Sequence, residues 1–146
     1  MVKHFKNLPY LALCVLIFST SASAQKKFTR QDTLRGSLTP ERAWWDVLLY
    51  NIAITPDFNT KTINGAISIE FKVLKPGKKM QIDLQTPMQI TNATDLNSKK
   101  LSYSRTGNVY YINFPQTLKA GEEHIIHIYF KGKPREAVNP PWDGGW

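Results

Sequence analysis

An alternation of apolar and polar side chains between Ile63 and Val73 limits what this 146-residue chain can fold into. From residue 67 onward every odd position is apolar and every even position is polar, and Ile63 extends the apolar row. A period of two places the apolar side chains on one face of an extended strand, whereas a helix would scatter them around its axis. We therefore predict a half-buried β-strand over 63–73, ended by the turn at Pro76-Gly77.

The rest of the chain is predicted to form strands as well. Between Trp44 and Ile54 the even positions 48, 50, 52 and 54 are apolar, and Asp46 interrupts this face near its start. Shorter strands are expected over 80–84 and 124–131, with a hairpin over 101–114 that turns at 105–108. Segment 124–131 is apolar on both faces, which predicts an interior strand. No long helical period and no repeat is present, so the predicted fold is all-β, an antiparallel β-sandwich or curved sheet.

Two short segments receive local predictions. Thr39, Pro40 and Glu41 place a capping hydroxyl, a first-turn proline and an acid in sequence, which predicts one helical turn. Asn92-Ala93-Thr94 matches a glycosylation acceptor, and we interpret it as a turn. The predicted organisation is a signal peptide over 1–24, an extension over 25–43, a β-domain over 44–133 and a Pro/Gly-rich linker over 134–146.

The N-terminus has the three parts of an export signal. Lys3, His4 and Lys6 form a positive head, Leu8 to Phe18 an apolar run, and 22–24 a small-residue cleavage site. The apolar run is short of the ~20 residues that span a bilayer, so no stable membrane anchor is expected. Cleavage after residue 24 would also remove the single cysteine. We expect an exported protein, periplasmic or secreted, without disulfides.

Charge and histidine spacing argue against two kinds of site. The chain has a formal net charge of +8, but its basic pairs at 78–79, 99–100 and 131/133 fall in separate predicted turns, so no nucleic-acid partner is expected. His124 and His127 are three residues apart on a predicted strand and point to opposite faces. A zinc-binding helix needs histidines four apart on one face. We assign no catalytic and no metal-ligating residue to this chain.

One stretch resembles a known family. A Trp-Asp-Val-x-x-Tyr strand (45–50), an Asn-Thr-Lys loop (59–61) and a Gly-x-x-x-Ile-x-Phe strand (65–71) are similar to the first domain of the aminopeptidase N family of zinc metallopeptidases. That family's His-Glu-x-x-His and Gly-Ala-Met-Glu-Asn segments do not occur in this sequence. The resemblance therefore implies an N-terminal β-domain, with zinc and peptide hydrolysis located in the catalytic domain of the parent protein.

The C-terminal segment extends the resemblance. Secreted bacterial members of the family have a similar Pro-Pro-Trp-Asp-Gly-Gly segment, which implies that the tail contacts the catalytic domain or shapes the rim of its cleft. The residues so assigned are Trp142, Asp143, Gly144, Gly145 and Trp146. The alternative is a secreted module that binds carbohydrate or protein through its tryptophans, of which Trp44 and Trp45 are the other two.

Overall fold

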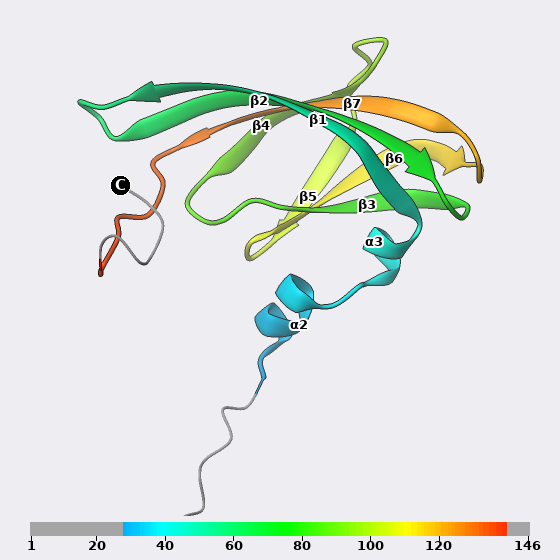
Figure 1. Cartoon of the computed structure of the whole chain (residues 1–146), viewed down its shortest axis with the longest axis horizontal. Coiled ribbons are helices and arrows are strands. Elements are labelled where there is room, and N and C mark those ends of the chain that lie inside the picture. The colour runs from blue at the N-terminus through cyan, green and yellow to red at the C-terminus, as the bar shows by residue number, and fades with distance from the viewer. Residues whose placement is uncertain (1–27, 140–146) are drawn as a thin grey trace, which may run out of the picture.

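The structure is a computed structural model, and it describes residues 28–139 (Figure 1). Two helices come first, α2 (Arg30–Gly36) and α3 (Pro40–Ala43). Seven strands follow: β1 (Trp45–Asp57), β2 (Thr62–Val73), β3 (Gly77–Asp83), β4 (Gln89–Asp95), β5 (Ser102–Thr106), β6 (Val109–Leu118) and β7 (Glu123–Gly132). Within 28–139 no helix has the length and apolar character needed to cross a membrane.

The strands form two antiparallel sheets that face each other. One has the order β1-β2-β7-β4 and the other β3-β6-β5. Figure 1 shows the longer sheet arching over the shorter one, with α2 and α3 beside the latter. The predicted all-β fold of packed antiparallel sheets is confirmed, and β7 is an interior strand as expected.

The core lies between the sheets and contains the apolar row that the sequence placed on β2. Ile69 and Phe71 of β2 are fully buried against Met80 of β3 and Ile112 of β6. Trp44, at the entrance to β1, makes edge-to-face contacts with Phe71 and Phe114, with ring centroids 6.1 and 6.0 Å apart. These aromatic contacts are part of the core that joins the two sheets, which share no backbone ladder within residues 28–139.

The outer face of the three-stranded sheet is covered by the N-terminal helices. Leu34 of α2 packs on Val109 and Tyr111 of β6. Gln81 of β3 is 1% exposed, its Nε2 donates to the Leu34 carbonyl at 3.1 Å, and its Oε1 accepts from the Thr39 hydroxyl at 2.7 Å. One buried amide therefore ties both helices to the sheet, and its polar atoms are satisfied in the process.

The structure corrects three local predictions. Segment 92–94 is not a turn but part of β4, where Ala93 is fully buried opposite Ile128 of β7. The helical turn at residue 40 is present as α3, but the Thr39 hydroxyl bonds Gln81 rather than capping that helix. The basic residues predicted to lie in turns include Lys79, which is in β3, and residue 131, which is in β7.

Helix α2 was not predicted at all. It begins with a capping box, in which the Thr29 side chain accepts from the Asp32 backbone amide and the Asp32 carboxylate accepts from the Thr29 amide. The Thr-x-x-Asp spacing was therefore a readable signal for a helix start. The predicted extension over 25–43 contains two helices rather than one turn.

We predict that Gln81→Ala lowers the free energy of unfolding by about 1–3 kcal/mol, because the Leu34 carbonyl and the Thr39 hydroxyl lose their partner. Urea unfolding followed by circular dichroism measures this loss. Gln89→Ala is the matched control, since Gln89 is an exposed strand residue and its replacement should change stability by less than about 0.5 kcal/mol. Equal effects of the two substitutions would contradict the bridging role of Gln81.

Candidate functional site

Strand β1 is an exposed edge of the four-stranded sheet. Among the residues that the structure describes, it pairs with β2 only, and every residue of the strand after Trp45 is exposed. The exposed side chains include large apolar ones on both faces, with Leu49 and Ile52 each at 56%. Edge strands of soluble proteins are normally short, charged or covered, so a 13-residue apolar edge is a candidate binding surface.

A β-bulge decides which β1 side chains face the other sheet. The pairing register shifts between Val47, opposite Phe71, and Leu49, opposite Glu70, so Leu48 is the extra residue. Before the bulge odd positions share a face with the buried Phe71, and after it even positions share a face with Ile69. The predicted even-numbered apolar face is therefore correct from Tyr50 to Ile54 but wrong at 48, where Val47 takes the inward place.

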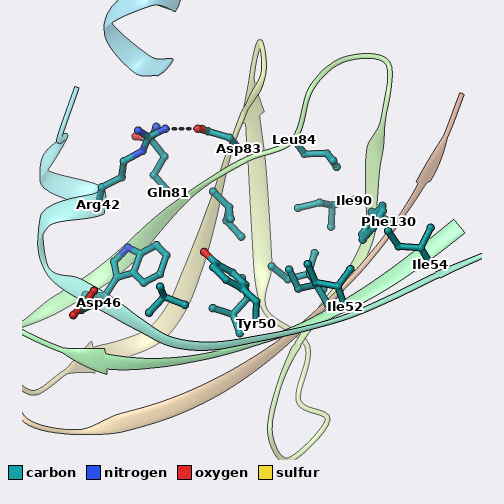
Figure 2. A pocket seen from close by; sticks show the side chains of 16 residues that line it. Arg42, Asp46, Tyr50, Ile52, Ile54, Gln81, Asp83, Leu84, Ile90 and Phe130 are labelled. Carbon is teal, nitrogen blue, oxygen red and sulfur yellow. Dashed lines mark hydrogen bonds and ion pairs between the residues drawn. The ribbon is translucent and has the colours of Figure 1, made fainter. Parts of the chain in front are cut away.

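The inward face of β1 forms one wall of an apolar groove of about 710 Å³ between the sheets (Figure 2). Aliphatic and aromatic side chains supply most of its surface. From the four-stranded sheet come Trp45, Val47, Tyr50, Ile52, Ile54, Ile67, Ile69, Ile90, Ile128 and Phe130, and opposite them lie Ile82 and Leu84. Figure 1 shows the two sheets diverging along β1, which leaves this space between their apolar inner faces.

The two ends of the groove differ. At the end near α3, Arg42 forms an ion pair with Asp83, and Figure 2 shows this pair beside Gln81. At the other end the ring of Phe130 lies over Gly65, where an added Cβ would come within 2.3 Å of its Cζ. Glycine at 65 thus lets Phe130 lie flat across the sheet beside Ile54, which is also paired with Gly65. The end near α3 therefore holds two charged side chains that pair with each other, and the end at Phe130 is apolar.

Few groups in the groove can take part in proton transfer. The titratable side chains in its lining are Arg42, Asp46, Tyr50 and Asp83. Burial raises the pKa of the Tyr50 phenol above its ordinary value. A raised phenol pKa keeps Tyr50 neutral in the range where proteins work. The groove is suited to binding apolar side chains rather than to acid–base chemistry.

The histidine prediction is confirmed by the strand register. His124 lies opposite the buried Phe71 and its ring is 5.8 Å from that ring, whereas His127 lies opposite Ser68 on the outer face and bonds its hydroxyl at 2.8 Å. Across residues 28–139 no three His, Cys, Asp or Glu side chains gather as they would around a metal ion. Glu122 lies near His124, and hydrogen bonds from the Lys119 amide and the His124 ring lower its pKa.

The tryptophans in the described residues do not form a sugar-binding platform. Trp44 is 5% exposed and its Nε1 donates to the Lys79 carbonyl at 2.8 Å. Trp45 is half-buried, packs on Phe71 with centroids 5.8 Å apart, and donates to the Glu41 carbonyl. The five residues that the sequence assigned to an interdomain contact, Trp142, Asp143, Gly144, Gly145 and Trp146, lie outside the described residues, so that assignment stays a prediction.

Comparison with known proteins connects this architecture to one group of enzymes. No protein-family model and no curated protein sequence matches the chain. Among solved structures, the M1 zinc metallopeptidase from Deinococcus radiodurans matches over 70% of this chain and 24% of its own, with a TM-score of 0.57 and 18% identity. A mutant of that metallopeptidase bound to a Tyr-Ser-Ala substrate matches over 68% and 23%, with a TM-score of 0.58 and 19% identity.

The likeness is one of fold. The sequence identity is low, and the chain spans about a quarter of the length of these metallopeptidases. A two-domain M1 zinc metallopeptidase mutant bound to L-arginine gives the same picture, with a TM-score of 0.57 and 23% of its chain covered. The matching region is thus a minor part of each of these proteins.

The raised pKa of Tyr50 predicts a difference in alkaline stability. The folded chain holds the phenol proton more tightly than the unfolded chain, so this stabilisation is complete below the unfolded pKa of about 10 and is lost as pH rises through the folded pKa. In urea unfolding between about pH 8 and 11, wild-type stability should fall more steeply than that of Tyr50→Phe. Tyr129→Phe, on the outer face of the sheet, controls for loss of a phenol that lies outside the groove. Identical slopes for wild type and Tyr50→Phe would contradict the prediction.

Proposed function

We propose that this chain is an exported N-terminal β-domain of a zinc metallo-aminopeptidase that removes N-terminal residues from peptides. The observation that carries the proposal is the fold likeness to M1 zinc metallopeptidases, in which a region of this fold is one part of a larger chain. The sequence resemblance to the aminopeptidase N family also supports it, because it rests on the residue pattern of 45–71 and of the tail.

The residues of that resemblance have structural positions in this domain. Trp45 starts β1, Tyr50 lines the groove, Gly65 underlies Phe130, and Phe71 is fully buried in the core. All four belong to the β1–β2 hairpin, the largest hairpin of the fold. These positions give the four residues structural roles in the hairpin, and the proposal assigns none of them a catalytic role.

The proposed division of labour follows from what the described residues contain. They hold no cluster of metal ligands, so zinc and its general base would belong to a catalytic domain elsewhere in the parent protein. Zinc in such enzymes activates a water for attack on the scissile carbonyl. This domain would then form one rigid side of the active-site cleft. It would meet peptide substrates only as part of the parent protein. The tail from Trp142 to Trp146 is proposed to lie at the boundary with that partner, where the edge of this domain meets it.

The first test concerns zinc and hydrolysis. The purified chain should bind no stoichiometric zinc and should leave aminoacyl reporter substrates intact, whereas the longer polypeptide encoded by the same reading frame should hold one zinc and hydrolyse them. Elemental analysis and a fluorogenic assay on both proteins measure this. A tightly held zinc in the chain alone, lost in His127→Ala, would refute the division of labour. A stop codon directly after codon 146, together with glycan binding lost in Trp142→Ala, would favour the secreted binding module.

The second test concerns export. We propose that residues 1–24 are a signal peptide, which places the protein in the periplasm or outside the cell. When the full chain is expressed in a host with export machinery, N-terminal sequencing should find Gln25 as the first residue. Replacing both Ala22 and Ala24 with a bulky residue should block cleavage and leave the larger form in the membrane fraction. A mature protein that retains Met1 in the cytoplasm would contradict the proposal.

A further inference from the structure

The free edge of β1 lacks the usual protection against pairing. Between Val47 and Thr55 it carries no charged side chain and no proline, and its one bulge lies near its start. The backbone groups on the side away from β2 have no strand partner in residues 28–139. Natural edges are normally blocked by lysine, proline or a covering segment. β1 therefore has the properties of a strand that a further segment covers.

The groove determines what kind of segment fits. A partner has to supply backbone donors and acceptors along β1 and, at the same time, apolar side chains toward Tyr50, Ile52 and Ile54. An extended strand does both, since alternate side chains point into the groove while its backbone pairs with the edge. A helix laid in the groove would leave the β1 backbone unpaired. The fitting segment is thus a strand with large apolar residues at even spacing.

The path of the chain brings its own C-terminal segment to this place. β7 is antiparallel to β2, and β2 is antiparallel to β1, so β7 runs parallel to β1 and ends at Gly132 beside the β1–β2 turn. Glu136 then lies 3.6 Å from Lys61 of that turn, and 2.9 Å from Lys133. In Figure 1 the segment after β7 lies on the side of the four-stranded sheet that faces the shorter sheet. Because Glu136 is held at the β1–β2 turn, a segment that follows Asn139 begins on the same side of the domain as the Phe130 end of the groove, and if it ran back along β1 it would be antiparallel to that strand.

The two tryptophans of residues 140–146 have the spacing that this requirement sets. In an extended strand Trp142, Gly144 and Trp146 share one face, and the two tryptophan Cα atoms are about 13 Å apart. Tyr50 and Ile54, also four residues apart, have the same spacing along β1. Pro140 and Pro141 come first, where a strand tolerates residues without an amide hydrogen. Seven residues extend over roughly 23 Å, enough to pass most of the groove.

The N-terminal segment is a weaker candidate to cover the edge of β1. Residues 1–27 precede α2, and Leu34 of α2 packs on Val109 and Tyr111, on the outer face of the three-stranded sheet. The groove opens on the inner face of the other sheet, so a segment leaving α2 starts on the wrong side of the domain. The C-terminal segment also carries the two large aromatics.

From these observations we infer that Pro140–Trp146 pairs with β1 as an antiparallel edge strand and inserts Trp142 and Trp146 into the inter-sheet groove. The segment completes the four-stranded sheet as a fifth strand, and each tryptophan buries on the order of 200 Å² of apolar surface. This inference does not depend on the proposed enzymatic function, because it concerns contacts within one chain. In a longer polypeptide the sheet would be completed first, and the chain would continue from its edge.

Amide hydrogen exchange tests the pairing directly. In the full chain, amides of 47–55 should exchange about tenfold or more slowly than in a variant that ends at Asn139. Amides of β5, an edge of the other sheet, should be unchanged and serve as an internal control. Trp142→Ala combined with Trp146→Ala should abolish the slowing.

A variant of the same composition distinguishes strand insertion from non-specific adhesion of the tryptophans. Exchanging two neighbours, with Trp142→Asp and Asp143→Trp, keeps the length and composition but turns one tryptophan away from the groove. Ile52→Asp places a charge in the groove from the opposite wall. Both changes should restore fast exchange in 47–55 while sedimentation shows a monomer.

Three outcomes would overturn the inference. Equal exchange of 47–55 in the full and truncated chains would mean that the segment does not cover β1. Retained protection in the exchanged-neighbour variant would mean that the tryptophans adhere without strand register. Protection that depends on protein concentration and survives truncation would mean that a second copy pairs with β1 instead.

Discussion

The arrangement of the whole domain depends on Trp44. It is the last residue before β1, yet its ring contacts Phe71 of the longer sheet and Phe114 of the shorter one, and its indole donates to the Lys79 carbonyl of β3. Gly77 of β3 leaves room for this ring, since a Cβ there would lie 2.1 Å from its Cδ2. The two sheets are therefore fastened at the start of β1. Beyond that point β2 is the only strand that pairs with β1 within residues 28–139, the sheets diverge, and the groove lies between them.

The strands with the clearest periodicity could be predicted from sequence, and the weaker ones could not. β2 has one buried row and β7 has apolar side chains on both faces, so the strand character of both and the interior place of β7 followed from the pattern. β4 was missed because Asn92, Thr94 and Asp95 favour turns locally. Pairing with β7, more than thirty residues away, overrides that preference and buries Ala93. Local sequence contains no information about such a partner.

The candidate site was harder to predict than the fold. The opposite orientation of His124 and His127 follows from strand geometry and was correct. The groove was not predicted, because strand periodicity identifies β1 as a strand but does not say that it lies at an edge. That depends on the order β1-β2-β7-β4, which is set by contacts distant in sequence. The bulge at Leu48 could not be predicted either. One extra residue there reverses which side chains of β1 face the other sheet, and the composition of the strand does not reveal it.

The position of β7 also affects when the domain can form. It is the last described strand along the chain, yet it lies between β2 and β4 and is the only link between them. Until residue 132 is available, β1 and β2 can exist only as a hairpin, and β4 has no neighbour in its sheet. Contacts of this sequence separation form slowly, because a long loop must close before they are gained. A chain that passes through a narrow translocation channel from its N-terminus could thus complete the four-stranded sheet only after β7 had emerged on the far side.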